Sequence, residues 1–106
     1  MIQLAGLDER VRPYAEAALR WARLYGVTPT ITSVHRSSAE QARLYANYKA
    51  GRSRYPAAPP GRSLHEYGLA WDSWVPDADM AWWVAVRRAY GWHVPSNDLI
   101  HAEVPT

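Results

Sequence analysis

The first third of the chain shows a helical period followed by an alternating one. In residues 7–25, apolar side chains recur every three or four positions with Arg and Glu between them, which predicts an amphipathic helix. Pro13 suits the first turn of this helix, and Gly26 suits its carboxyl end. Residues 27–34 (V-T-P-T-I-T-S-V) are rich in β-branched side chains and alternate, so they predict a strand, which Pro29 places at a sheet edge.

The middle of the chain predicts a helix, a loop and an extended segment. Ser37 and Ser38 each precede a Glu or Gln by three residues, which gives two overlapping capping boxes for a helix that runs through about Lys49. Residues 51–61 (G-R-S-R-Y-P-A-A-P-P-G) hold three prolines and two glycines, so they predict a restricted loop at the rim of a groove. Residues 63–74 are predicted to be extended.

The last third predicts one more helix and two short strands. Residues 76–90 begin with acidic side chains and carry Arg87 and Arg88 near their end, as the helix dipole favours. Residues 92–94 and 99–104 predict strands separated by a turn. The order helix, strand, helix, strand, helix, strand, strand favours an α+β fold, with helices packed on one side of a small antiparallel sheet.

Composition limits the interpretation further. At 106 residues the chain is predicted to be one domain, residues 1–106, with a core built from its six Trp and seven Tyr, whose polar atoms need partners. A net charge of +2 without basic runs argues against nucleic-acid binding. The absence of Cys excludes disulfides and thiolate zinc sites. We expect no export signal, because the N-terminus lacks a basic region followed by a long apolar stretch. We expect no membrane insertion, because no segment approaches ~18 consecutive apolar residues.

The candidate chemistry lies mainly in residues 62–72 (R-S-L-H-E-Y-G-L-A-W-D). His65 and Asp72 are able to reach one divalent ion if the chain turns near Gly68. His101 lies in a short apolar run that reads as a strand and supplies a third candidate ligand. Two His, one Asp and an open position form the ligand set of a catalytic zinc ion, so we predict one Zn²⁺ here.

Three further residues are candidates for catalysis and substrate binding. Asp98 lies three residues before His101 and is predicted to act as the catalytic base. Arg36, between a strand and a helix, is predicted to stabilise negative charge on the carbonyl oxygen. Ser63 is predicted to hydrogen-bond a backbone or carboxylate group of the substrate.

Structural roles remain open for several of these side chains. His65 and Asp72 alone would also suit a hydrogen-bonded structural pair, and Asp98 would suit a turn cap. Glu66 is expected on the other face of an extended segment, solvated or ion-paired. Glu103 is expected to share the face of His101 and either to orient it or to form a plain salt bridge. The remaining histidines are expected at the surface or in the groove; they are His35 and His93.

The run at residues 63–72 resembles the S-x-H-x-x-G-x-A-x-D signature of the VanY-like zinc peptidoglycan peptidases. This family comprises D-alanyl-D-alanine carboxypeptidases and dipeptidases, and the L-alanyl-D-glutamate endopeptidases of phage endolysins. Residues 33–45 are similar to its S-G-Y-R-S-x-x-x-Q-x-x-L-Y segment. Residues 90–92 and 98–103 match its Y-G-[FW] and [DE]-x-W-H-x-E elements. The resemblance covers roughly residues 27–104, in the right order.

The resemblance implies a fold shared with the hedgehog signalling domain. Residue by residue, it implies zinc at His65, Asp72 and His101, Asp98 as catalytic base, and Arg36 as the substrate and oxyanion contact. The chain departs from the family at Ile100, where Trp is usual, and at residues 34–35, where Gly-Tyr is usual. Neither departure removes a ligand.

The function implied by the resemblance is zinc-dependent hydrolysis of stem-peptide bonds in bacterial peptidoglycan, by a monomer. Asp at position 98, where many carboxypeptidases of the family carry Glu, favours an L-alanyl-D-glutamate endopeptidase. The alternatives are a D-alanyl-D-alanine carboxypeptidase and a catalytically silent, zinc-containing binding module. The expected lack of an export signal and of a separate cell-wall-binding domain suits a phage lysis enzyme that is made in the cytoplasm and released through a holin.

Overall fold

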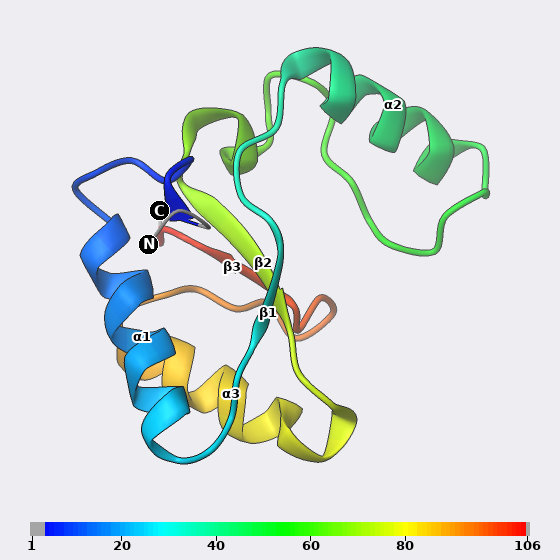
Figure 1. Ribbon diagram of the computed structural model, residues 1–106. Helices are drawn as coiled ribbons and strands as arrows, with labels where there is room; N and C mark the ends of the chain where they lie inside the picture. The colour runs from blue at the N-terminus through cyan, green and yellow to red at the C-terminus, as the bar shows by residue number, and fades with distance from the viewer. Residues whose placement is uncertain (1–3, 106) are drawn as a thin grey trace.

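The computed structural model describes residues 4–105 and shows an α+β fold (Figure 1). Its three strands form one antiparallel sheet in the order β1-β2-β3. No helix among the described residues is long and apolar enough to cross a membrane. The elements, in chain order, are α1 (Arg12–Leu24), β1 (Thr30–Ser33), α2 (Ser38–Lys49), the short 3₁₀ helix η2 (Leu64–Tyr67), β2 (Ala70–Trp74), α3 (Asp77–Ala89) and β3 (His101–Glu103).

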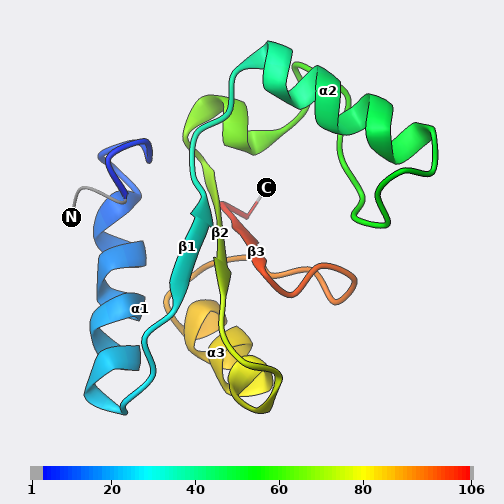
Figure 2. The same cartoon turned by 45° about the vertical axis from the view of Figure 1, so that its right-hand side comes forward.

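Helices α1 and α3 lie together against the sheet, whereas α2 lies at the opposite end of the molecule (Figures 1 and 2). Successive side chains of a strand point to opposite faces. Trp71 and Ser73 on β2 therefore face α1 and α3, while Asp72 between them faces away. The predicted packing of helices on one side of the sheet holds for α1 and α3 and is wrong for α2.

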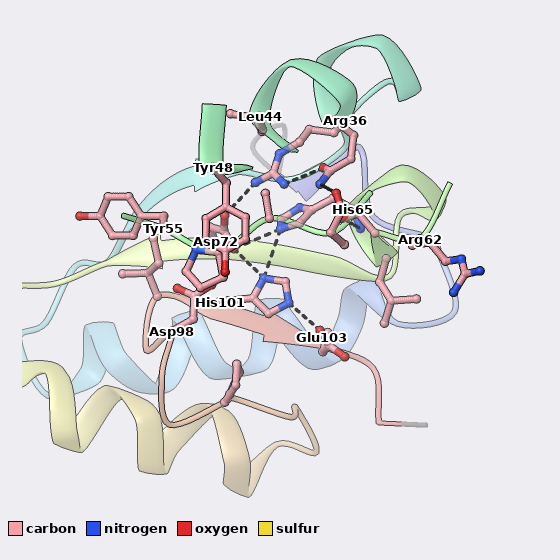
Figure 3. Close-up of a pocket in the computed structure, with 18 of the residues that line it drawn as sticks. Arg36, Leu44, Tyr48, Tyr55, Arg62, His65, Asp72, Asp98, His101 and Glu103 are labelled. Carbon is pink, nitrogen blue, oxygen red and sulfur yellow. Dashed lines mark hydrogen bonds and ion pairs between the residues drawn. The ribbon is translucent and has the colours of Figure 1, made fainter. Parts of the chain in front are cut away.

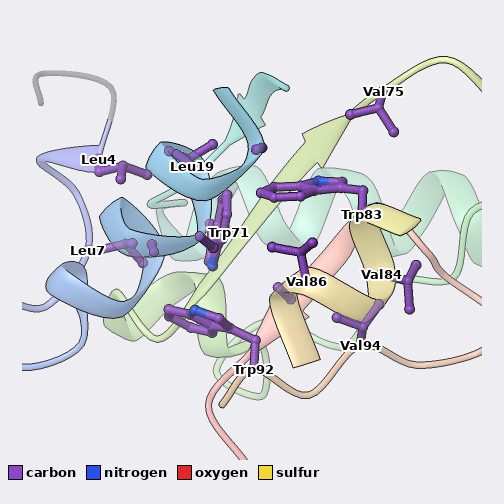
Figure 4. Close-up of a cluster of buried hydrophobic side chains, with 14 residues drawn as sticks. Leu4, Leu7, Leu19, Trp71, Val75, Trp83, Val84, Val86, Trp92 and Val94 are labelled. Carbon is purple, nitrogen blue, oxygen red and sulfur yellow. The ribbon is translucent and has the colours of Figure 1, made fainter. Parts of the chain in front are cut away.

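The core between the helices and the sheet is built around three tryptophans (Figure 4). No tyrosine of the described chain is among the buried core side chains, so the prediction that tyrosine rings also build the core is wrong. The Trp71 ring meets the rings of Trp83 and Trp92 nearly edge-on, at centroid distances of 6.1 and 5.7 Å. The Trp83 indole donates a 2.8 Å hydrogen bond to Ser73 Oγ. The indole N–H groups of Trp71 and Trp92 have no partner among the described residues, so the expectation that every ring nitrogen is paired is wrong.

Tertiary contacts shorten several predicted elements. The first helix begins at Arg12 instead of residue 7, because the Asp8 N–H donates to the Gly68 carbonyl at 2.9 Å and holds the preceding residues in turns. The strand predicted over residues 27–34 is limited to β1. The strand predicted over residues 92–94 is only an isolated bridge between His93 and Glu103.

The prediction of a continuous extended segment over residues 63–74 is wrong. Residues Leu64–Tyr67 form η2, and only Ala70–Trp74 is a strand. The cause is a capping box, in which Ser63 and Glu66 satisfy the backbone N–H groups at the start of the turn. Glu66 is therefore hydrogen-bonded and not ion-paired within the described chain: its carboxylate accepts from the Gly61 and Ser63 N–H groups and from the Ser38 hydroxyl.

Candidate metal centre

Three different elements bring His65, Asp72 and His101 together (Figure 3). Asp72 on β2 pairs directly with His101 on β3, so the two side chains share one face of the sheet. His65 projects from η2 toward them. The left-handed backbone of Gly68, with φ of 70°, makes the turn that separates η2 from β2. The sequence predicts this turn and all three side chains of the cluster.

The ligand atoms of the cluster have the spacing that zinc requires. Asp72 Oδ1 lies 3.1 Å from His65 Nε2 and 3.0 Å from His101 Nδ1, and the two nitrogens are 3.3 Å apart. Ligands at about 2.0–2.1 Å from a tetrahedral zinc ion lie about 3.3 Å from one another. The three atoms therefore approximate one face of a zinc tetrahedron, and the fourth corner is left for water or substrate.

Hydrogen bonds on the far side of each ring fix the tautomer and the orientation of the two imidazoles. His65 Nδ1 lies 2.7 Å from the Val34 carbonyl oxygen, and His101 Nε2 lies 2.7 Å from Glu103 Oε1. Both partners are acceptors, so these ring nitrogens carry the hydrogens. In the neutral rings, the nitrogens that face Asp72 are then bare acceptors. Three acceptors meet without a donor, and the cluster needs a cation or an added proton.

The electrostatics of the cluster agree with its geometry. Burial opposes ionisation of Asp72, but its contacts with His101 and His65, which donate to it when protonated, outweigh burial and hold the pKa of this carboxyl well below its usual value. Burial likewise opposes a charge on His101, yet its contacts with Asp72 and Glu103 raise the pKa of this imidazole. Glu103 thus orients the neutral His101 ring, and the same contact is an ion pair only when His101 is protonated.

Arg36 lies beside the cluster, as predicted, but its guanidinium is largely engaged with protein. Its Nη2 donates to Asp72 Oδ2 at 3.1 Å, and its Nη1 donates to Gln41 Oε1 at 3.0 Å. Gln41 is 1% exposed and donates in turn to the Ala58 carbonyl of the loop over residues 51–61. Arg36 therefore directs Asp72 Oδ1 toward the imidazoles, and its role as a substrate contact stays a prediction.

Asp98 and Ser63 line the same cavity of about 630 Å³ as the three cluster residues. Burial raises the pKa of Asp98, as suits a group that accepts a proton. The backbone of Asp98 makes the turn contacts, because its N–H donates to the Pro95 carbonyl and its own carbonyl accepts from the His101 N–H. The Ser63 hydroxyl accepts from the His65 N–H, so its own hydrogen is available to a substrate.

The cavity has two different ends on either side of the cluster (Figure 3). Tyr48 of α2 and Tyr55 of the rim loop lie at one end, and Arg62 and Glu103 lie at the other. The rim prediction for residues 51–61 is consistent with this position. Three residues that line the cavity were not identified from the sequence: Gln41, Tyr48 and Tyr55. The glutamine of the resemblance motif was the one available signal.

Two predicted surface histidines lie outside the cluster. His35 and His93 are both exposed. The Glu103 side chain contacts His101, while its backbone pairs with His93, so the strand brings His93 near the site without making it a ligand. The expectation that these histidines are not ligands agrees with their positions.

The fold and the cluster together resemble those of the VanY-like zinc peptidases. Solved structures confirm the predicted resemblance to this family and the predicted α+β fold. The cluster of His65, Asp72 and His101 has the composition of a group that could hold a metal ion. No protein-family profile matches the chain. No curated protein matches it either.

Three of the similar solved structures are of peptidases. VanY D,D-pentapeptidase of a VanB-type resistance cassette, in complex with Zn(II), has a TM-score of 0.73 and 25% identity, covering 92% of this chain and 72% of VanY. VanYB with D-alanine-D-alanine has a TM-score of 0.75 and 25% identity, covering 92% of this chain and 71% of that one. The LD-carboxypeptidase LdcB, at 21% identity, shares the fold with a TM-score of 0.72, covering 95% of this chain and 66% of LdcB.

Proposed function

We propose that this protein is a zinc-dependent peptidase that hydrolyses a peptide bond in the stem peptide of bacterial peptidoglycan. The observation that carries the proposal is the convergence of His65, Asp72 and His101 on one point of the cavity, with Asp98 beside them. The names of the similar structures support it, because VanYB is described in complex with D-alanine-D-alanine and LdcB is linked to peptidoglycan recognition.

The chain's own residues divide the chemistry among them. A zinc ion held by the cluster supplies a Lewis acid that lowers the pKa of water and polarises a carbonyl group. Asp98 accepts the proton of the attacking water and passes it to the leaving amine. Arg36 keeps Asp72 oriented and presents its remaining N–H groups to negative charge on the carbonyl oxygen. Ser63 donates its hydroxyl hydrogen to a carbonyl or carboxylate of the peptide.

We propose the L-alanyl-D-glutamate bond as the preferred target. The support is Asp98, since the resemblance associates Asp at this position with the endopeptidases. The alternative is cleavage at the carboxyl end of the stem peptide, and it is supported by the similar structures, which are named as a D,D-pentapeptidase and as LD-carboxypeptidases. A silent binding module is disfavoured because Asp98 is present and lines the cavity.

Product analysis of digested peptidoglycan tests the proposal. Purified peptidoglycan is incubated with the zinc-loaded protein, with a chelator-treated sample beside it, and the products are identified by mass spectrometry. New amino-terminal D-glutamate that disappears on chelation is the expected result. Released D-alanine would move the assignment to a carboxypeptidase. No product from a protein that retains zinc would favour the silent module.

A further inference from the structure

Arg87 of α3 is a buried cation that the chemistry described above does not use. Its side chain is 0% exposed, although fully buried arginines are rare in proteins. Its neighbour Arg88 is exposed. No carboxylate of the described residues lies within ion-pair distance of Arg87. A buried charge without a carboxylate is costly, so its other contacts must account for it.

The guanidinium of Arg87 is held by main-chain carbonyls. Its Nη1 donates to the Ile100 carbonyl at 3.2 Å, and its Nη2 donates to the Leu99 carbonyl. Its Nε donates to the Trp83 carbonyl one helical turn back at 3.3 Å, and the group lies 5.2 Å from the centroid of the Trp83 ring. The fixed fork of an arginine is suited to such neighbouring acceptors, and the single ammonium of lysine is not.

The two carbonyls that Arg87 holds belong to the residues between Asp98 and His101. These residues lie in a turn before β3. The Ile100 carbonyl also accepts from the Ser73 N–H at 2.9 Å, which ties the same point to β2 next to Asp72. Arg87 and Ser73 thus fix, from behind the sheet, the segment that carries the candidate base and the third ligand.

We propose that Arg87 is a positioning residue that sets the placement of Asp98 and His101 through the carbonyls of Leu99 and Ile100. The inference rests on the proposed function only for the role of Asp98. The charge of Arg87 adds attraction toward Asp72 and Asp98, and although burial lowers the pKa of Arg87 to about 10, it remains a cation at neutral pH.

The test compares Arg87→Met with Arg88→Met. Met keeps the length of the side chain but removes every donor. Arg88 serves as the matched control because it is the exposed neighbour on the same helix and donates to a single carbonyl, that of Val94. Arg87→Lys is the second variant, because it retains the charge without the fork. Three quantities are measured: hydrogen exchange of the Asp98 and His101 amides, zinc affinity by competition with a chelating dye, and kcat and KM separately.

For Arg87→Met we expect the exchange rates of these two amides to increase more, relative to the wild type, than those of the rest of the chain. We also expect a zinc affinity lower by about tenfold or more, and a fall in kcat with little change in KM. Arg87→Lys should recover part of each effect, and Arg88→Met should match the wild type. Wild-type zinc affinity and local exchange in a folded Arg87→Met or Arg87→Lys variant would overturn the proposal. So would exchange that rises uniformly over the chain. Zinc affinity and exchange do not depend on peptidase activity, so an inactive wild type would refute the proposed function alone.

Discussion

At the scale of single residues, each candidate ligand is fixed by a second contact. Val34 and Glu103 accept the far hydrogens of the two imidazoles, and Arg36 occupies the second oxygen of Asp72. The sequence predicts the identities of the three ligands, because their spacing follows a recognisable motif. It does not predict the Val34 contact, since a backbone carbonyl leaves no signal in side-chain identity.

Replacing the candidate base tests its role separately from metal binding. Asp98→Asn removes the proton acceptor and preserves the shape of the side chain, so kcat should fall about 10²- to 10⁴-fold. Zinc content should be unchanged, because Asp98 is not among the clustered ligands. Ser96→Ala, in the same turn, should retain full activity. An Asp98→Asn enzyme with unchanged kcat would show that another group accepts the proton.

The pH dependence of the wild-type activity should also show that Asp98 acts as the base. Asp98 is active only when deprotonated, and burial raises its pKa above the ordinary value of 3.8. kcat/KM should therefore be lost as the pH falls through this raised pKa, and should recover above it. A rate profile measured at saturating zinc separates this loss from loss of the metal. If the residual activity of Asp98→Asn showed the same loss of kcat/KM at low pH, that loss would belong to a group other than Asp98.

At the scale of elements, the sequence predicts helices better than strands. The helix α2 begins where the capping serine predicts, because Ser37 accepts from the Glu40 N–H. The short strands could not be delimited from sequence, since their ends depend on pairing with residues far along the chain. The 3₁₀ turn η2 was detectable from the S-x-x-E spacing of Ser63 and Glu66, but the alternation around it favoured an extended interpretation.

The turn between η2 and β2 should be sensitive to the loss of its glycine. A Cβ at Gly68 would lie 2.9 Å from the Gly6 carbonyl oxygen and 3.0 Å from the Asp8 nitrogen, both of them backbone atoms. Gly68→Ala should lower the free energy of unfolding by about 1–2 kcal/mol, because Ala disfavours the left-handed backbone. The clash should lower it by about 1–3 kcal/mol more.

Gly51→Ala is the matched control for this substitution. Gly51 is also left-handed, with φ of 76°, but a Cβ there would meet nothing within 4 Å. It should lose only the first contribution, about 1–2 kcal/mol. Chemical denaturation measures both free energies of unfolding. Equal losses in the two variants would contradict the packing of Gly68 against residues 6–8.

At the scale of the whole molecule, the site lies between the sheet and the part of the chain formed by α2 and its following loop. Helices α1 and α3 lie against the sheet at one end of the molecule, and α2 lies at the other end (Figure 2). Residues of α2 and of its following loop line the cavity. The sequence predicts the fold class and the metal cluster. It does not predict that Gln41 and Arg87 link these layers to the site, because burial of a polar side chain depends on the complete packing.

The metal-free protein should have a stability maximum in weakly acidic solution. The pKa of His101 is raised by folding, so its stabilisation is complete below about pH 6.5 and is lost as the pH rises through the folded pKa. The pKa of Asp72 is lowered, so its stabilisation is present above about pH 3.9 and is lost as the pH falls further.

Zinc should reverse the alkaline part of this dependence. The metal binds deprotonated ligands, so it stabilises the protein more as the pH rises. Thermal unfolding across pH, with and without zinc, measures both trends. A metal-free protein whose melting temperature rises steadily above pH 7 would contradict the assignment of His101 as the group that gains a proton.

The zinc content of the dialysed protein tests the central claim most directly. The three candidate ligands should hold one ion per chain in the wild type and in His93→Ala, since His93 is exposed and lies outside the cluster. His101→Ala should bind far less zinc under the same conditions while remaining folded by circular dichroism. A wild type that retains no zinc, or a His101→Ala protein that retains it fully, would contradict the assignment of this cluster as the metal centre.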